Sequence, residues 1–254
     1  MTKNLLHALP PGILRPAFFL REYFFPFGCS VCGTNLVGAG ESWYGLCEEC
    51  RAAVELEFSH GLAGGTCDRC GRPLVSEHGS CLSCRAAGPS DAPDRTVVLF
   101  PYAGRYRNLL RAYKFGKNLA AGNFFAEKML EVLGSGEFPG AAVVPVPPRP
   151  GRVRETGWDQ VEYLARLLEG RPGGNGGVKV SRCLRRLKSE SQKELGREGR
   201  KTNLRRRIVA ASRPPETAVV IDDVMTTGST LAACAAALRE AGTKTVFGLC
   251  LFWD

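Results

Sequence analysis

The chain has 254 residues, of which 44% are hydrophobic and 23% are charged. This composition is ordinary for a globular protein and excludes general disorder, and the length suits one large domain or two modest ones. Charge is unevenly placed: residues 1–94 carry 7 basic and 10 acidic side chains, and residues 95–254 carry 27 and 15. Eight of the eleven cysteines lie in the acidic part.

The N-terminal segment, residues 1–28, is apolar, but prolines and arginines interrupt it. It lacks both the run of about 18 apolar residues that a membrane helix requires and the unbroken apolar core of a signal peptide. We expect it to pack onto the rest of a cytoplasmic protein, with membrane contact as the alternative. In the cytoplasm cysteines stay reduced, which argues against disulfides.

Residues 29–88 contain four Cys-x-x-Cys pairs. Two residues between thiolates let both sulfurs of one tight turn bind a single tetrahedral zinc ion, and a second pair completes a four-cysteine site. This region therefore predicts structural zinc. Its pairs are Cys29/Cys32, Cys47/Cys50, Cys67/Cys70 and Cys81/Cys84.

An internal repeat indicates how these pairs combine. The unit C-x-x-C-G-x-x-L-V followed by C-x-x-C-R-A-A occurs twice, with a shorter insert in the second copy. Gly33 and Gly71 take the same place in the two copies, where the turn needs a residue free to adopt positive φ. The repeat predicts two tandem zinc ribbons, formed by the first and the last four cysteines, with a cross-braced arrangement as the alternative. This part of the chain is negatively charged, which argues against contact with nucleic acid. We therefore expect zinc to replace a hydrophobic core that is too small to fold alone.

After a linker at Ala86–Arg95, residues 96–254 alternate between strand and helix patterns. Alternation of this kind predicts an α/β fold with a mostly parallel sheet, helices on both faces, and a ligand beyond the carboxyl ends of the strands. We expect three further cysteines, Cys183, Cys234 and Cys250, to be small core residues. The expected strands are 97–103, 143–146, 178–184, 218–222 and 245–253, and 170–177 is expected to be a loop. A helix is expected after the first strand, with Tyr106, Leu109, Leu110 and Tyr113 at helical spacing, and further helices at 118–133, 158–169 and 229–241.

One segment, A-V-V-I-D-D-V-M-T-T-G-S-T at residues 218–230, has the pattern of a phosphate site. The turn Thr226–Thr230 offers backbone N–H groups, hydroxyls and a helix N-terminus, which together suit a phosphate monoester. Asp222 and Asp223, expected at the strand end, could accept hydrogen bonds from sugar hydroxyls or hold Mg2+ through water. The alternative is an ordinary strand-to-helix turn, but adjacent buried carboxylates without a partner would be costly.

This segment resembles, at all thirteen positions, the 5-phosphoribosyl-1-pyrophosphate (PRPP) binding motif of type I phosphoribosyltransferases. From Cys29 to Leu251 the chain is similar to the ComF family, in which a zinc-binding region precedes a phosphoribosyltransferase-like domain and which is linked to DNA uptake in natural transformation. Family members usually show Arg-Gly-Phe-Asn-Gln where this chain has T-G-W-D-Q at 156–160. The other matching residues are Lys114-Phe115, P-V-P-P-R at 145–149, Arg152, Arg154, Ser191-Gln192, Leu195, Arg200 and Asn203.

The resemblance implies a role for each part of the site. Asp222 and Asp223 would hold the ribose hydroxyls. Lys114 and the turn at Val146, Pro147 and Arg149 would meet the pyrophosphate and its Mg2+. Residues 188–203, including Arg200, would be the mobile loop that covers PRPP. The 5′-phosphate would lie on Thr226, Thr227, Gly228, Ser229 and Thr230.

Residues 182–207 carry 11 basic and 3 acidic side chains, which suits a mobile anion-binding segment. A solvated charged helix is the alternative. Because only twelve residues follow Gly242, we expect the zinc region, rather than a C-terminal subdomain, to contact any acceptor.

These observations predict a PRPP-binding protein that transfers a phosphoribosyl group to an unidentified acceptor. One alternative is a non-catalytic accessory protein that binds PRPP, single-stranded DNA and other DNA-uptake proteins. A zinc-ribbon adaptor with a vestigial site is the other, against which the intact motif argues.

Overall fold

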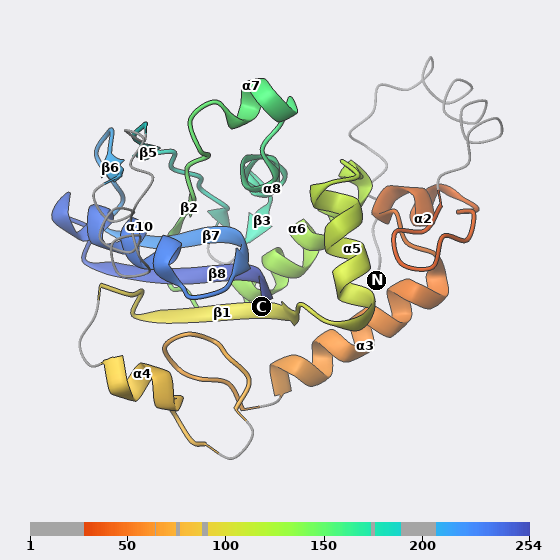
Figure 1. The fold of residues 1–254 in the computed structure, drawn as a ribbon, viewed down its shortest axis with the longest axis horizontal. Helices are drawn as coiled ribbons and strands as arrows, with labels where there is room; N and C mark the ends of the chain where they lie inside the picture. The colour runs from red at the N-terminus through yellow and green to blue at the C-terminus, as the bar shows by residue number, and fades with distance from the viewer. Residues whose placement is uncertain (1–27, 64, 75–76, 88–90, 174–175, 189–206) are drawn as a thin grey trace, which may run out of the picture.

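A computed structural model describes residues 28–63, 65–74, 77–87, 91–173, 176–188 and 207–254. They form an α/β fold around a four-stranded sheet whose strands are ordered β1-β8-β7-β2 and are all parallel (Figure 1). The predicted α/β class and parallel sheet are therefore confirmed. The strands are β1 (Arg95–Pro101), β2 (Ala142–Pro145), β7 (Thr217–Met225) and β8 (Thr245–Trp253).

The two central strands, β7 and β8, are apolar almost throughout because both faces of the sheet are covered. They pair in register from Thr217↔Thr245 to Met225↔Trp253. The sequence prediction ended β7 at residue 222, which is wrong, because β8 supplies a hydrogen-bonding partner as far as Trp253. Asp222 and Asp223 consequently lie inside the strand, and their side chains contact one another.

Each face of the sheet has its own cover (Figure 1). On one side lie α10 (Ser229–Glu240) and a hairpin of β5 (Leu184–Arg186) and β6 (Ile208–Ala210). On the other lie α6 (Leu119–Gly134) and α8 (Gln160–Leu168), with α5 (Gly104–Lys114) packed on α6. Helices α6, α8 and α10 occupy the expected ranges to within two residues, and α5 contains the four residues expected at helical spacing. Cys183, Cys234 and Cys250 are fully buried, as predicted.

The prediction of a strand at 178–184 is wrong. Val180 makes only an isolated parallel bridge to Val143, and the chain then turns away so that Leu184 begins β5. The neighbouring strand β2 ends at Pro145, and prolines cannot donate to a ladder, so a longer pairing has no template. Conversely, the expected loop at 170–177 contains two short antiparallel strands, β3 (Pro172–Gly173) and β4 (Gly176–Gly177).

The two cysteine-rich units pack on different parts of this body. The first unit, with α2 (Ala39–Tyr44) and α3 (Glu48–Ala63), packs on α5, α6 and β1. The second unit, with α4 (Leu82–Ala87), packs on β1. There Gly71 has φ 69°, and a Cβ on it would lie 2.7 Å from the carbonyl oxygen of Thr96. A short helix, α7 (Arg152–Thr156), precedes α8.

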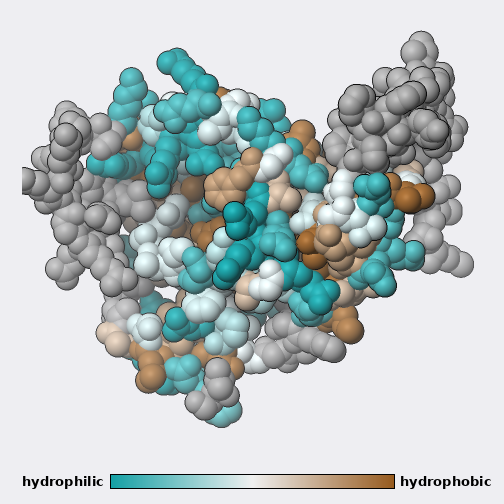
Figure 2. Space-filling view, turned by 45° about the vertical axis from the view of Figure 1, so that its right-hand side comes forward, coloured by the Kyte–Doolittle hydropathy of each residue, from teal (hydrophilic) through white to brown (hydrophobic). Residues whose placement is uncertain are grey.

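Exposed large apolar side chains are spread over several elements rather than gathered on one. On the face shown in Figure 2, hydrophobic residues form small patches separated by hydrophilic ones. No helix within the described ranges combines the length and the apolar character needed to cross a membrane.

Candidate functional site

The turn between β7 and α10 places hydroxyls and free N–H groups at the carboxyl edge of the sheet. Gly228 precedes the helix with φ 70°, a left-handed conformation that suits glycine. The Thr227 hydroxyl donates to Ser229 Oγ over 3.1 Å and accepts a bond from the Ser229 N–H. Thr226 and Thr227 are exposed, and the first turn of α10 contains Ser229 and Thr230. Unpaired N–H groups and the positive end of the helix dipole favour an anion at this position.

Asp223, on the α8 side of β7, belongs to a three-residue cluster. Its Oδ2 lies 2.6 Å from Lys114 Nζ and accepts a 2.8 Å hydrogen bond from the side-chain amide of Gln160. The exposed fractions of the Asp223 and Lys114 side chains are 8% and 22%. Although burial opposes ionisation, the Lys114 ammonium and the Gln160 amide hold the pKa of Asp223 below its usual range. Asp223 is therefore ionised at neutral pH.

Buried tyrosine Tyr113 fixes this cluster. Its hydroxyl donates to the backbone carbonyl of Gln160 over 2.6 Å, which ties the end of α5 to the start of α8. Lys114 and Gln160 thus approach Asp223 from two helices that are bonded to one another. The sequence matched Gln160 within a family motif without giving it a role. The sequence does contain a signal for Gln160: it is a polar residue on the apolar face of an amphipathic helix, one turn before Leu164.

Asp222, on the α10 side, has a different environment. It interacts electrostatically with Arg186 of β5 and with Cys234 of α10, and its Oδ1 accepts the N–H of Asp223 over 2.9 Å. Burial and the adjacent Asp223 carboxylate raise the pKa of Asp222 well above its usual range. Burial lowers the pKa of Arg186, as do Arg149 and other nearby cations, and within the described residues its Nε has no hydrogen-bond partner. This side of β7 therefore holds a buried acid beside a guanidinium that can still donate.

The turn after β2 lies next to Asp222. The N–H of Val146 donates to the carbonyl oxygen of Ile221, so the chain stays beside β7 past the end of the ladder. Val146 and Pro147 are buried, whereas Arg149 is exposed. The structure thus brings this turn and the Asp222–Asp223 pair to one edge of the sheet.

Asp159, where the resembling family usually has Asn, is the N-cap of α8. Its Oδ1 accepts the N–H groups of Val161 and Glu162 at 3.1 and 2.9 Å. Burial raises the pKa of Asp159, while the capping N–H groups and Arg152 oppose the rise. Asn caps a helix as well as Asp does, so this departure preserves the capping role.

The eight front cysteines form two clusters, each with all ligand atoms within 4.8 Å of one another. The tandem prediction is confirmed and the cross-braced alternative is wrong. In a tetrahedron with sulfurs about 2.3 Å from zinc, the edges are about 3.8 Å. The Sγ atoms of Cys32 and Cys47 are 3.7 Å apart, and those of Cys70 and Cys81 are 3.8 Å apart, so the donor sets fit zinc. The clusters are Cys29, Cys32, Cys47 and Cys50, and Cys67, Cys70, Cys81 and Cys84.

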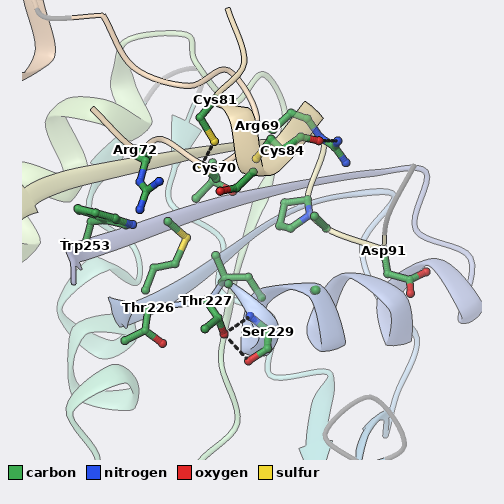
Figure 3. Close-up of a pocket in the computed structure, with 18 of the residues that line it drawn as sticks. Arg69, Cys70, Arg72, Cys81, Cys84, Asp91, Thr226, Thr227, Ser229 and Trp253 are labelled. Atoms are coloured by element: carbon green, nitrogen blue, oxygen red, sulfur yellow. Dashed lines mark hydrogen bonds between the residues drawn. The ribbon is translucent and has the colours of Figure 1, made fainter. Parts of the chain in front are cut away.

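A cleft of about 620 Å3 separates the second cysteine unit from the β7–α10 turn (Figure 3). Thr226, Thr227 and Ser229 line one side of it. The other side holds Arg69, Arg72 and three cysteines of the second cluster, and Trp253 closes the end beside Arg72. Sequence reasoning did not find this cleft, because its walls come together only through the packing of distant segments.

Two sequence predictions lie outside the described residues: Arg200 with most of the loop at 188–203, and the apolar segment before residue 28. Of the basic stretch at 182–207, residues 182–188 and Arg207 are described, and Arg182 forms ion pairs with Glu162 and Glu169.

Comparison with known proteins identifies no relative, since neither a family model nor a curated protein matches the chain. The functional assignment therefore depends on the chemistry of the residues at the site and on the motif resemblance.

Proposed function

We propose that this protein binds PRPP with Mg2+ at the carboxyl edge of β7 and β2, as a member of the ComF type with a phosphoribosyltransferase-like domain. One observation carries the proposal: a turn at 226–230 that favours an anion begins two residues after a carboxyl pair, and that pair has Lys114 of α5 and Arg186 of β5 beside it. PRPP has the matching sequence of groups, which are a phosphate, a ribose with two free hydroxyls and a pyrophosphate.

Each part of the ligand has a partner in the site. The N–H groups and hydroxyls of the turn bind the 5′-phosphate. Asp223, ionised and held by Lys114 and Gln160, accepts hydrogen bonds from a ribose hydroxyl, with Asp222 beside it. An ammonium has three donors, so Lys114 can keep its bond to Asp223 while it meets the pyrophosphate. Arg149 is exposed at the same edge and adds a second cation.

Mg2+ binds through few protein ligands and several phosphate oxygens in sites of this kind, so it enters with the polyphosphate. When bound, it neutralises charge on the pyrophosphate leaving group. The chain's own groups do the rest: they orient the sugar, and they hold the leaving group with Lys114 and Arg149.

In the transfer reaction, pyrophosphate leaves C1′ with the electron pair of the C1′–O bond. The acceptor forms the new bond to C1′ with its lone pair and releases a proton. This chemistry needs no nucleophilic side chain. The proposed acceptor site is on the side of the cysteine-rich region, and the two clusters hold zinc as structural ions.

The test is a calorimetric titration of the protein with PRPP, ribose 5-phosphate and pyrophosphate, each with and without Mg2+. We expect PRPP to bind most tightly and its binding to require Mg2+. Of the three ligands, only PRPP has both a phosphate for the turn and a pyrophosphate for Lys114 and Arg149. Equal affinity for PRPP and ribose 5-phosphate would contradict a site for the pyrophosphate half.

A pyrophosphate-release assay then separates transferase from accessory protein. The acceptors are purines, pyrimidines, amines and single-stranded DNA. Release with one acceptor identifies an enzyme. Binding of PRPP without release across the panel, together with DNA binding, identifies the accessory protein.

A further inference from the structure

The second cysteine unit forms one wall of the cleft that contains the phosphate-binding turn (Figure 3). Three of its ligands, Cys70, Cys81 and Cys84, border the cleft. Its metal site and the proposed 5′-phosphate site therefore share a single cavity.

This wall is held firmly against the sheet. Gly71 packs on the backbone of Thr96 so closely that no side chain fits between them. Inside the unit, Arg69 donates to the carbonyl oxygen of Cys84 over 3.0 Å. Arg239 of α10 donates to the carbonyl oxygen of Ala92 over 2.9 Å and pairs with Asp94, which ties the following linker to the helix. The position of the wall relative to the turn is thus fixed by contacts at several points.

Arg72 is the cation that this wall presents at the mouth of the cleft. Its guanidinium lies over the ring of Trp253, 4.6 Å from the centroid, and such cation–π contact fixes the plane of the group. Among the residues that the structure describes, no carboxylate pairs with Arg72. In Figure 3 the guanidinium and Trp253 stand across the mouth from Thr226. The first unit has Thr34 at the equivalent place in the repeat, so the arginine is not needed to form the metal knuckle.

We propose that Arg72 binds the phosphate monoester group held by the turn at 226–229, so that the second cysteine unit is a functional part of the ligand site. A planar guanidinium can bond two phosphate oxygens at once, and the turn supplies neutral donors for the others. This inference rests on the proposed function and adds to it a charged residue, from the second cysteine unit, that binds the 5′-phosphate.

A thermodynamic consequence follows for the metal. Because the knuckle between Cys67 and Cys70 positions Arg72, the metal in the second cluster and the phosphate ligand stabilise one another. Linkage is reciprocal, so each increases the affinity of the other by the same factor. The first cluster is packed on α5 and α6 and does not border the cleft, so it does not share this linkage.

The test uses Arg72→Thr, which introduces the residue that the twin knuckle carries, together with Arg72→Lys. The matched control is Arg85→Thr, on the exposed surface of α4 in the same unit and away from the cleft. Calorimetry measures binding of ribose 5-phosphate and of PRPP, and metal content and circular dichroism establish that every variant is folded with two zinc ions.

We expect Arg72→Thr to weaken both ligands about tenfold, the size of a lost charge-assisted hydrogen bond. Arg72→Lys should recover part of the loss because it restores the charge without the fork. The Arg85→Thr protein should bind as wild type does. Unchanged affinity in Arg72→Thr, with PRPP binding by the wild type, would overturn the inference and leave the proposed function standing. A wild type that binds neither ligand would overturn both.

Zinc release provides a second measurement. With a chromogenic chelator in excess, ribose 5-phosphate should slow the release of one of the two zinc equivalents from the wild type. In Arg72→Thr this protection should be lost. Protection of both ions, or equal protection in the two proteins, would overturn the linkage.

Discussion

The adjacent carboxyl groups of Asp222 and Asp223 on β7 contact one another but ionise differently, because the other groups around them differ. Asp223 meets an ammonium and an amide and stays ionised. Asp222 is buried beside it and is stabilised in its protonated form. Two carboxyl groups whose environments separate their pKa values give a site one permanent acceptor and one group that can donate or accept.

Asp222→Asn should therefore stabilise the ligand-free protein at neutral pH. A buried acid with a raised pKa binds its proton more tightly in the folded state, so wild-type stability falls as pH rises above the normal range of Asp. The slope is up to about 1.4 kcal/mol per pH unit, until the folded-state pKa is passed. The variant lacks this slope, so the difference in the free energy of unfolding between the variant and the wild type should increase from pH 4 upward. Urea denaturation at pH 4, 5, 6 and 7 measures this difference.

The same substitution should weaken PRPP binding, because the amide changes the hydrogen bonds offered to the ribose. Opposite effects on stability and on binding are typical of a functional site. A variant less stable than the wild type across this pH range would contradict the assigned environment of Asp222.

Lys114→Met should have the opposite effect on stability. The substitution keeps the volume of the side chain but leaves the ionised Asp223 without its cation, and breaking a largely buried pair costs about 2 kcal/mol here. Without the ammonium, burial raises the pKa of Asp223, and protonation of this carboxyl relieves the cost, so the deficit should shrink as the pH falls. Denaturation at pH 3.5 and pH 7 tests this, and a deficit that does not change with pH would contradict it.

At the scale of elements, the two cysteine units are alike in sequence but differ in what they pack against. Both knuckle glycines have positive φ, 79° for Gly33 and 69° for Gly71. A Cβ on Gly33 would meet nothing within 4 Å, whereas one on Gly71 would press on β1. The repeat thus builds two similar metal sites, of which the second is fitted to the sheet.

Gly71→Ala and Gly33→Ala form a matched pair that measures this docking. We expect Gly33→Ala to cost about 1 kcal/mol, the penalty for a left-handed alanine. Gly71→Ala should cost about 3 kcal/mol, because overpacking against Thr96 adds about 2 kcal/mol to the penalty for the left-handed alanine. Urea denaturation of the zinc-loaded proteins compares them. Equal losses in the two variants would mean that the second unit is not pressed against β1.

The sequence predicted the parts of the fold that depend on local pattern. The repeat indicated which cysteines share a metal, and helical spacing located α5, α8 and α10. It could not predict the true end of β7, which depends on how far its neighbour β8 extends. Nor could it predict that Gln160 bonds to Asp223 or that Arg72 covers Trp253. These contacts join residues far apart in the chain and exist only once the sheet and helices have packed.

At the scale of the whole molecule, the two cysteine units contact different parts of the body, and only the second borders the cleft. The first unit bonds to the connection after α5, where Asn118 donates to Ser30 Oγ over 2.9 Å, and this connection follows Lys114 directly. The second unit stands across the cleft from the phosphate-binding turn. The two cysteine clusters and the proposed ligand site thus belong to a single body.

Metal analysis should accordingly find two zinc ions per chain. Removing both with a chelator should lower the unfolding temperature, because the first unit contributes Leu36, Leu46 and other side chains to the common core and the second packs Cys70 against it. Elemental analysis and a thermal scan, before and after chelation, measure both effects. Fewer than two ions per chain would contradict the two-cluster assignment.

Whether β7 presents a PRPP site is tested most directly by the dissociation constant of PRPP, measured with Mg2+, for the wild type and for the Asp222→Asn/Asp223→Asn protein. If β7 presents the PRPP site, the wild type binds and the double variant, shown to be folded and zinc-loaded, binds about a hundredfold more weakly, on the order of the loss of one hydrogen bond to the ionised Asp223 and one to Asp222. Equal affinity in the two proteins, or no binding by the wild type, would contradict the claim.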